Sequence, residues 1–371
     1  MRKSLFSWAA LLLFAACTKE GNTIYAPDPN EEAASTMPLV TVIYDANALG
    51  DNSYNDLIYE GVERTAQELG LRTMQQSPRT YDEGLQYLEL MFRQMETAND
   101  SVRRLFIVTS PGYDDFIRKN NKRLAANPNA DLLYLETHKP LEGKGSTLFI
   151  TYYGAMYEGG RIAAATEQSS TILLGANRKT PSIYEALQGY SDGFEAGLQL
   201  LTEKEASKNH LASAFLDETG EGGFSVADTT ALRLLRQWSN EEISTLVPVC
   251  GGASNTFARM ISSLREEITF IGIDTYYDSY FSPYSVVKHI DRALAQTIRQ
   301  WLTNGTMPKH QSLGLKEGYT EVILNPNQSI CIWTPVGYEG TTVPTLTPEM
   351  KQEMHEEAVR KEEEHERQFT N

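Results

Sequence analysis

Short apolar runs alternate with amphipathic stretches through the middle of the chain. The runs predict one set of strands at residues 39–44, 71–74, 105–109, 132–135 and 148–152, and a second set at residues 171–175, 211–216, 245–250 and 270–274. Between the first two runs, residues 54–69 place Leu57, Ile58, Val62 and Ala66 on one helical face. This alternation is typical of parallel βαβ units. The fold class is therefore α/β, with two Rossmann-like lobes.

Elements after residue 274 bear on how the lobes connect. Residues 285–289, a helix at 290–301 and residues 314–324 are too many to complete the second lobe alone. We therefore expect the chain to cross between the lobes repeatedly. The expected first lobe comprises residues 38–153 and 275–309, and the second comprises residues 154–274 and 310–340.

The N-terminus predicts export. Two basic residues precede an apolar run over residues 5–16, which is too short to span a bilayer and fits a signal peptide of residues 1–17. The run ends in Leu-Phe-Ala-Ala before Cys17, and small residues before a cysteine resemble a bacterial lipobox. We expect lipidation at Cys17, which anchors a chain to a membrane without spanning it. An ordinary secretory peptide is the alternative.

Charge limits the possible partners. The formal net charge is −16 and no cluster of Lys or Arg stands out, so binding to nucleic acid through a basic face is not expected. Residues 18–37 are polar and aperiodic, and are expected to form a flexible tether. Residues 341–371 are expected to form an acidic C-terminal tail, either a solvated helix or a frayed end. His355 and His365 lie in that tail, and we expect no metal there.

Candidate chemistry concentrates after the first strand. Residues 45–55 place two carboxylates, three amides, a hydroxyl and an aromatic ring at a strand end, where open α/β sheets bind ligands. Loop polarity alone does not explain Tyr54 between Ser53 and Asn55. Ser53 and Asp56 have the spacing of a helix capping box. The junction therefore predicts half of a ligand pocket.

Several motifs in order resemble the basic membrane protein family of substrate-binding lipoproteins, whose members bind nucleosides for ABC import. The opening motif is residues 50–55 (Gly-Asp-Asn-Ser-Tyr-Asn) with 59–61 (Tyr-Glu-Gly). Residues 158–160 (Glu-Gly-Gly) and the Gly-spaced segment 188–197 follow. Residues 271–274 (Ile-Gly-Ile-Asp), with 285–288 (Ser-Val-Val-Lys) and Asp291, resemble the closing pair. The resemblance covers most of residues 39–325.

The resemblance implies a type I periplasmic binding protein-like fold with three crossovers, clamping a ligand between the lobes. It implies that Tyr54 and Phe224 sandwich a base, with Asp45 and Asn55 at the base edge. Asp274 and Lys288 match the family's ribose-contacting pair. The expected ligand-binding residues are Asp45, Ser53, Tyr54, Asn55, Asp115, Phe224, Asp274 and Lys288.

Alternatives remain for several of these residues. Either Asp114 or Asp115 supplies a further pocket carboxylate, or both only favour a helix N-terminus. Tyr54 stands where the family has Phe, which leaves the ligand open. Asn47 and Asn255 are further candidate pocket amides. Phe224 packed in the core, Asp274 as a turn residue and Lys288 on an exposed strand edge are the structural alternatives.

Other chemistry has little support in the sequence. Residues 175–180 lack the glycine that a phosphate loop needs before its Lys, and metal-binding and hydrolase motifs are absent. We expect no enzyme activity, no catalytic residues and no cofactor. Beyond Cys17, Cys250 and Cys331 lie in apolar runs. Buried free thiols are expected, although a disulfide is permitted after export.

The expected protein is a monomeric lipoprotein of the bacterial envelope that captures a nucleoside and presents it to an ABC permease and ATPase. It would face the periplasm or the outer surface. One alternative is a binding protein for another small polar ligand, such as a sugar. Another is a sensory or scaffolding lipoprotein without a transporter.

Overall fold

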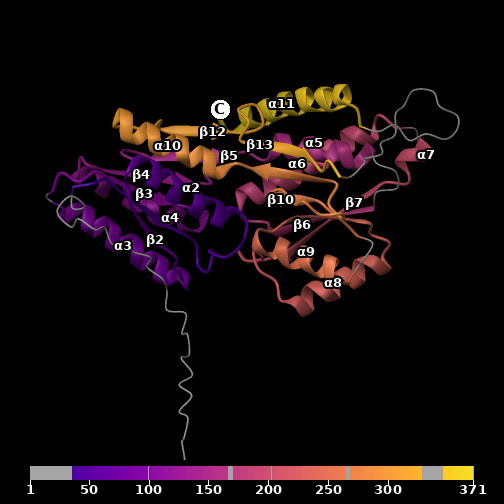
Figure 1. Cartoon of the computed structure of the whole chain (residues 1–371), viewed down its shortest axis with the longest axis horizontal. Helices are drawn as coiled ribbons and strands as arrows, with labels where there is room; N and C mark the ends of the chain where they lie inside the picture. The colour runs from indigo at the N-terminus through magenta and orange to yellow at the C-terminus, as the bar shows by residue number, and fades with distance from the viewer. Residues whose placement is uncertain are drawn as a thin grey trace, which may run out of the picture.

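The structure is a computed structural model that describes residues 36–98, 100–165, 170–201, 203–264, 268–327 and 346–370. The predicted signal peptide, Cys17, most of the tether and Cys331 lie outside these residues. Two α/β lobes stand side by side, the first formed mainly by the N-terminal part of the chain (Figure 1).

The first lobe contains a six-stranded parallel sheet in the order β12-β5-β4-β3-β1-β2. Its strands are β1 (Leu39–Ile43), β2 (Arg72–Gln76), β3 (Arg104–Val108), β4 (Ala130–Leu135), β5 (Ser146–Ile150) and β12 (His310–Leu313). Its helices are α2 (Tyr54–Leu69), α3 (Tyr81–Thr97), α4 (Asp114–Asn120) and α10 (Ile290–Asn304). Buried apolar side chains form one cluster on each face of the sheet, as expected for parallel strands.

The second lobe contains two smaller sheets, of order β7-β6-β8-β9 and β10-β11-β13. The strands are β6 (Ser170–Asn177), β7 (His210–Asp217), β8 (Thr245–Val249), β9 (Thr269–Phe270), β10 (Gly272–Asp274), β11 (Tyr284–Lys288) and β13 (Thr320–Leu324). The helices are α5 (Tyr153–Ala165), α6 (Pro181–Leu198), α7 (Glu203–Ala206), α8 (Asp228–Asn240) and α9 (Gly252–Leu264). The run at residues 270–274 therefore forms two short strands where one was expected.

Helices α5 and α6 pack with their backbones almost in contact. A Cβ at Gly160 would overlap the carbonyl of Tyr190, and one at Gly193 would overlap the carbonyl of Tyr157. The glycines of two motifs noted in the sequence are therefore needed for helix packing in the second lobe. Gly61 similarly lets α2 approach α10, because a Cβ there would lie 2.7 Å from the Cα of Asp291.

Three connections link the lobes, as predicted: β5 to α5, β11 to α10, and β12 to β13. The expected lobe boundaries were wrong at two places. Residues 284–288 belong to the second lobe, because β11 pairs with β10. Residues 310–313 belong to the first lobe, because β12 pairs with β5. Pairing partners decide lobe membership, and the apolar pattern does not reveal them.

The predicted capping box at α2 is also wrong. The Ser53 hydroxyl caps no N–H of the helix and instead donates to Asp274. Asp51 accepts the backbone N–H groups of Ser53, Asn55 and Asp56 in its place. Its carboxylate thus satisfies the first N–H groups of the helix.

The C-terminal segment forms a helix, α11 (Pro348–Thr370), that lies along α5 and ends near β12 (Figure 1). Met354 and Ala358 are buried in the apolar core of the second lobe. Glu362 and His365, nearer the C-terminal end of the helix, are also buried. A helix was one of the two expected forms, but the expectation that the segment is solvated was wrong, because the helix is docked along one face. Cys250 is a buried free thiol, as expected.

Candidate ligand-binding site

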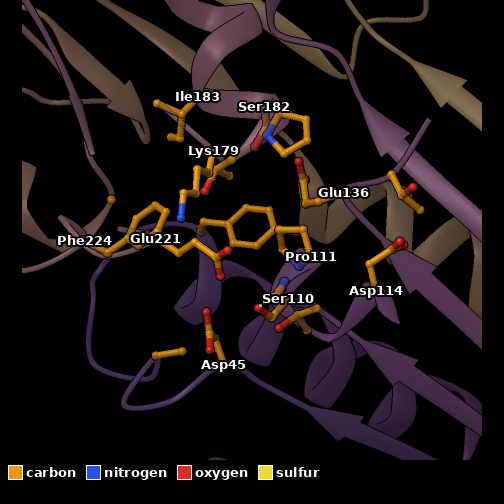
Figure 2. Close-up of a pocket in the computed structure, with 18 of the residues that line it drawn as sticks. Asp45, Ser110, Pro111, Asp114, Glu136, Lys179, Ser182, Ile183, Glu221 and Phe224 are labelled. Atoms are coloured by element: carbon orange, nitrogen blue, oxygen red, sulfur yellow. Dashed lines mark hydrogen bonds between the residues drawn. The ribbon is translucent and has the colours of Figure 1, made fainter. Parts of the chain in front are cut away.

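A cavity of about 1070 Å³ lies between the lobes at the carboxyl ends of their strands (Figure 2). The first lobe supplies the residues that follow its strands, among them Asp45, Thr109, Glu136 and Tyr152. The second lobe supplies Lys179, Phe224, Gly251, Asp274 and Lys288 in the same way. This is the position at which open α/β sheets bind small ligands.

Seven of the eight residues expected to bind ligand line this cavity: Asp45, Tyr54, Asn55, Asp115, Phe224, Asp274 and Lys288. The eighth, Ser53, does not line it, but its buried hydroxyl donates to Asp274 Oδ2 at 2.7 Å. The structure therefore brings together residues that are separated by more than two hundred positions in the sequence.

Three buried polar residues line the cavity and form what we call its floor: Asp274, Lys288 and Glu136. Asp274 forms one half of this floor. It is 8% exposed, has a positive φ of 67°, and accepts hydrogen bonds from the hydroxyls of Ser53 and Tyr152. Burial, together with the charge of Asp274, raises the pKa of Tyr152 well above its usual value. Tyr152 therefore stays protonated and acts as a donor. Asp274, at the end of β10 in the second lobe, is thus bound by two hydroxyls of the first lobe, which is more than a turn residue requires.

Lys288 and Glu136 form the other half of the floor. Lys288 Nζ lies 3.0 Å from Glu136 Oε1, and their side chains are only 3% and 6% exposed. The ammonium also lies 5.1 Å from the centre of the Tyr54 ring and 4.7 Å from that of Tyr152. Lys288 is therefore not an exposed edge residue. A buried ion pair is costly unless its remaining polar atoms are also satisfied.

Three polar atoms around this floor are buried and have no hydrogen-bond partner in the described protein: the Tyr54 hydroxyl, Thr109 Oγ1 and Glu136 Oε2. All three residues line the cavity. Burial, with Glu136 nearby, raises the pKa of Tyr54 well above its usual value, so its hydroxyl remains a potential donor. Buried polar atoms are rarely left unpaired, and these three are suited to hydroxyl or amine groups of a ligand.

Phe224 lies nearer the rim and is 37% exposed, so it is not a core residue. The loop that carries it is fixed by Gly223, which has φ +86° and lies so close to Ala176 that a Cβ would overlap the carbonyl. The Asn177 side-chain amide donates to Gly222 O at 2.8 Å. The Phe224 ring and the Tyr54 ring therefore reach the cavity from different lobes.

The remaining acidic candidates differ in their surroundings. Figure 2 shows the Asp45 carboxylate pointing into the cavity, and within the described part of the chain it accepts only the N–H of the neighbouring Ala46. Asp114 is bound by Arg118 Nε at 2.8 Å. Asp115 is exposed on the cavity wall. Both acids also lie in the first turn of α4, so the two interpretations of this pair are compatible.

Three amides have structural partners. Asn55 Nδ2 donates to Asp51 Oδ2 at 2.9 Å, and Asn47 Nδ2 donates to Arg79 O at 2.8 Å, although both residues line the cavity. Asn255 does not line it, which corrects the sequence expectation. Its amide donates to the carbonyl of Asp51 and accepts from the hydroxyl of Tyr277, so it joins the second lobe to the α2 entry loop.

Sequence reasoning missed Thr109, Glu136 and Tyr152. Each follows a strand of the first lobe, so the strand-end rule that identified Asp45 would also have identified them. Gln368 and Phe369, which also line the cavity, had no such signal. Their position depends on where α11 docks.

No family model and no curated protein matches the chain. Solved structures do match. A solute-binding protein of an ABC transporter system from Aeropyrum pernix K1 is 17% identical, with a TM-score of 0.64 over 90% of this chain and 91% of that one. The fold is that of the type I periplasmic binding proteins.

Two further matches are proteins of different kinds. A periplasmic solute-binding protein from Actinobacillus succinogenes 130z with bound D-allose is 12% identical, with a TM-score of 0.54 over 78% of this chain and 98% of that one. A transcriptional activator of the comK gene from Bacillus halodurans is also 12% identical, with a TM-score of 0.61 over 87% and 96%. At these identities the likeness shows the fold.

Within the described residues, no group of three or more His, Cys, Asp or Glu side chains could hold a metal ion. His355 instead binds Glu158 at 3.0 Å, and His365 stacks on Tyr153. None of the described helices has the length and apolar content to cross a membrane.

Proposed function

We propose that this protein captures a purine nucleoside between its lobes and presents it for uptake by an ABC transporter. The observation that carries the proposal is the composition of one cavity. Tyr54 and Phe224 line it from different lobes, above a buried floor of Asp274 and the Lys288–Glu136 pair. A flat base suits the two rings, and a hydroxyl-rich sugar suits the charged floor.

In this arrangement each side chain has a distinct role. The rings of Tyr54 and Phe224 stack on the base, and Asp45 accepts from an N–H at its edge. Asp274 and Glu136 accept hydrogen bonds from hydroxyls of the ribose. Lys288 donates a hydrogen bond to one of these hydroxyls, and its positive charge balances the two carboxylates. Because both lobes contribute, ligand favours the closed arrangement over an open one.

The proposal also includes an anchor in the membrane and partners to which the ligand is delivered. Lipidation at Cys17 would tether a monomeric protein to the bacterial envelope, through residues 18–37, without spanning the membrane. The partners would be a permease and an ATPase, and the protein would catalyse no reaction. Metabolic labelling with a radioactive fatty acid tests the anchor: wild type should incorporate label, a Cys17→Ala variant should not, and an unlabelled wild type would contradict the proposal.

A sugar is the second candidate ligand. The D-allose in the Actinobacillus structure supports it, because that protein shares the fold. A floor of carboxylates and an ammonium also suits a free sugar. A third candidate is a role without a transporter, which the Bacillus halodurans activator supports because it shares the fold. The ligand distinguishes the first two candidates, and a neighbouring permease gene would argue against the third.

Thermal unfolding with a ligand panel tests the proposed ligand class. The panel contains adenosine, guanosine, inosine, uridine, D-allose and D-ribose. A nucleoside present at 100 times its Kd should stabilise the protein by about 2.7 kcal/mol, which raises Tm by several degrees. A shift with a purine nucleoside and none with D-allose supports the proposal. A shift with D-allose alone overturns it in favour of the sugar.

A further inference from the structure

Helix α11 contacts both lobes along its length. Toward its N-terminus, Lys351 Nζ donates to Val322 O on β13 at 3.0 Å, and Glu357 accepts from Tyr157 and binds Arg161 on α5. Toward its C-terminus, Glu366 accepts from Ser312 on β12, a strand of the first lobe. Figure 1 shows the helix running from above α5 to the edge of the first lobe.

Glu362 lies between these two sets of contacts and joins two of the three crossovers. Its Oε2 accepts the N–H of Gly154 at 2.9 Å, in the first turn of α5, directly after the connection from β5. Its Oε1 accepts the N–H of Leu315 at 2.8 Å, in the connection from β12 to β13. A Cβ at Gly154 or at Gly314 would overlap the Glu362 side chain. Both crossovers therefore carry a glycine where the carboxylate is seated.

The last turn of α11 reaches the cavity. The Phe369 ring stacks on His138, with 4.1 Å between ring centres and parallel planes, and both residues line the cavity. His138 follows β4 in the first lobe, and its Nε2 lies 3.3 Å from Glu185 on α6 in the second lobe. Phe369 thus covers a contact that bridges the lobes at the cavity wall.

We propose that α11 is a strap across the hinge, which holds the lobes together and supplies Phe369 as part of the ligand-cavity wall. Separating the lobes would pull Ser312 and His138 away from Val322 and Arg161, and α11 contacts all four. Opening therefore breaks contacts at one end of the helix. Glu362 is the positioning residue that seats the helix on the crossovers. The effect on ligand rests on the proposed function, whereas the effect on the lobes does not.

The distance between the lobes without ligand tests the strap. Spin labels attached through p-acetylphenylalanine at Gln86 on α3 and Ser239 on α8, both exposed, leave native cysteines untouched. These helices lie on the side of the molecule away from α11 (Figure 1). Full-length protein should give one narrow distance distribution by pulsed electron resonance. Phe369→Ala and Glu362→Gln should each add a population at longer distance.

The two variants test different parts of the strap. Phe369 is 49% exposed, so its truncation leaves the fold intact. In Glu362→Gln, the amide oxygen can still accept one N–H, but the amide NH₂ faces the second donor. Glu353→Gln, the same substitution at an exposed position of α11, is the matched control and should keep the wild-type distribution. Wild-type distributions in both Phe369→Ala and Glu362→Gln would overturn the proposal.

Binding of adenosine then separates this inference from the proposed function. Apparent affinity scales with the fraction of protein in the binding-competent state. Phe369→Ala should therefore weaken adenosine about 2- to 10-fold, as expected for one lost aromatic pair. If wild type does not bind adenosine while the variants still open, the strap stands and the nucleoside proposal fails. An unchanged adenosine Kd in Phe369→Ala would show that Phe369 contributes nothing to ligand binding.

Discussion

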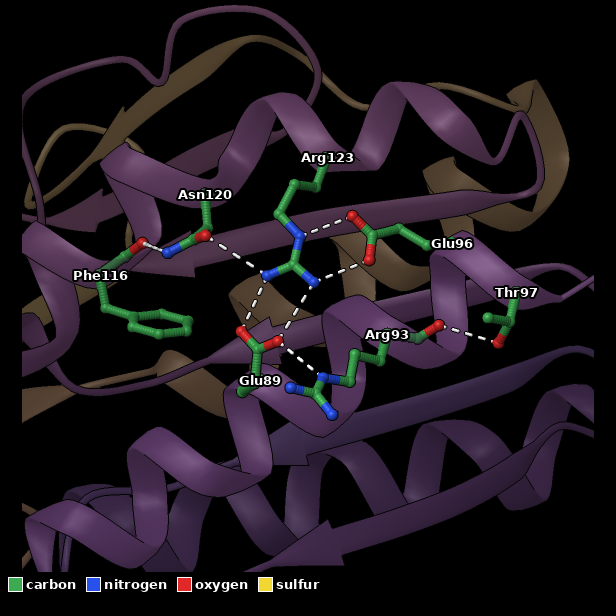
Figure 3. Close-up of polar contacts among 7 residues, drawn as sticks. All are labelled: Glu89, Arg93, Glu96, Thr97, Phe116, Asn120 and Arg123. Carbon is green, nitrogen blue, oxygen red and sulfur yellow. Dashed lines mark hydrogen bonds and ion pairs between the residues drawn. The ribbon is translucent and has the colours of Figure 1, made fainter.

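Two ion-pair clusters, one on the surface of the first lobe and one in the cleft between the lobes, differ in how completely their atoms are satisfied. On the surface, Arg123 binds Glu96 through two contacts of 2.6 and 2.7 Å and binds Glu89 through contacts of 2.8 and 3.3 Å, as Figure 3 shows. Arg93 adds a further contact to Glu89 at 2.9 Å. In the cleft, Lys288 binds only one oxygen of Glu136, and the other oxygen is buried without a partner.

This difference distinguishes an ion-pair cluster that stabilises the fold from one that has room for a ligand. The surface cluster joins α3 to the segment after α4, and its carboxylate oxygens are all paired. The cleft cluster is far more buried and yet incomplete, which is costly for the protein alone. An incomplete buried cluster in a cavity is therefore a better indication of a ligand site than a complete one on the surface.

The largest expected effect comes from breaking the cleft pair. Lys288→Met leaves Glu136 buried without its cation, so we expect a loss of about 3–5 kcal/mol in the free energy of unfolding. Adenosine binding should fall below detection in calorimetry. Combining Lys288→Met with Glu136→Gln should restore much of the stability without restoring binding. Adenosine binding at wild-type affinity in Lys288→Met would contradict the assigned site.

The two rings should have the next largest effect. Tyr54→Ala and Phe224→Ala should each weaken adenosine about 5- to 150-fold, because base stacking contributes about 1–3 kcal/mol. Tyr184→Ala, an exposed aromatic outside the cavity lining, should leave the Kd unchanged. Calorimetric titration measures all three. Unchanged affinity in both cavity variants would exclude the sandwich.

Tyr54→Phe tests the hydroxyl of Tyr54 separately from its ring. It removes a buried hydroxyl that has no partner in the protein, so the variant should be at least as stable as wild type. If adenosine affinity is also unchanged, Tyr54 serves as a stacking ring only. A loss of affinity would show that the hydroxyl contacts the ligand.

The sequence predicted most of the cleft because strand ends and ring positions are local features. One cavity is lined by all five residues that the sequence placed at strand ends, at a helix start or in a loop, namely Asp45, Tyr54, Phe224, Asp274 and Lys288. The sequence failed where a side chain had two possible partners, as at Ser53, which binds Asp274 instead of capping its helix. It also failed for α11, whose acidic composition concealed a docked face. Glu362 is buried only because two distant crossovers supply N–H groups and the space beside glycines.

That buried carboxyl predicts a pH dependence of stability. Burial, with Glu366 and Glu185 nearby, raises the pKa of Glu362 to about 8, from an ordinary value near 4.5. The folded state therefore holds this proton more tightly than the unfolded state. The contribution is fully present below about pH 4.5 and is lost as the pH rises toward 8.

The test compares Tm of wild type and Glu362→Gln across that range. The titrating neighbours Glu366, Glu185, His365 and His138 are present in both proteins, so the difference between the two curves isolates Glu362. The Tm difference, wild type minus variant, should decrease between pH 5 and 8. A difference that stays constant, or that increases with pH, would show that Glu362 is ionised throughout.

The smallest effect is expected at the surface cluster. Arg123→Gln should lower Tm slightly and leave adenosine binding unchanged, because exposed ion pairs contribute little. Arg123 and Arg93 lower the pKa of Glu89 to about 2. The stabilisation is therefore present above the ordinary pKa near 4.5 and is lost as the pH falls toward 2. A Tm difference between variant and wild type that persists at pH 2 would contradict this account.

The most direct test of the central claim is whether the cleft floor binds sugar hydroxyls. Calorimetric titration compares adenosine with 2′,3′-dideoxyadenosine, which has the same base and lacks both hydroxyls. Hydrogen bonds to charged groups contribute about 1.5–3 kcal/mol each, so we predict that removing two hydroxyls weakens binding at least about 100-fold. Equal affinities for the two compounds, or no binding of adenosine at all, would contradict the claim that Asp274, Glu136 and Lys288 hold a nucleoside.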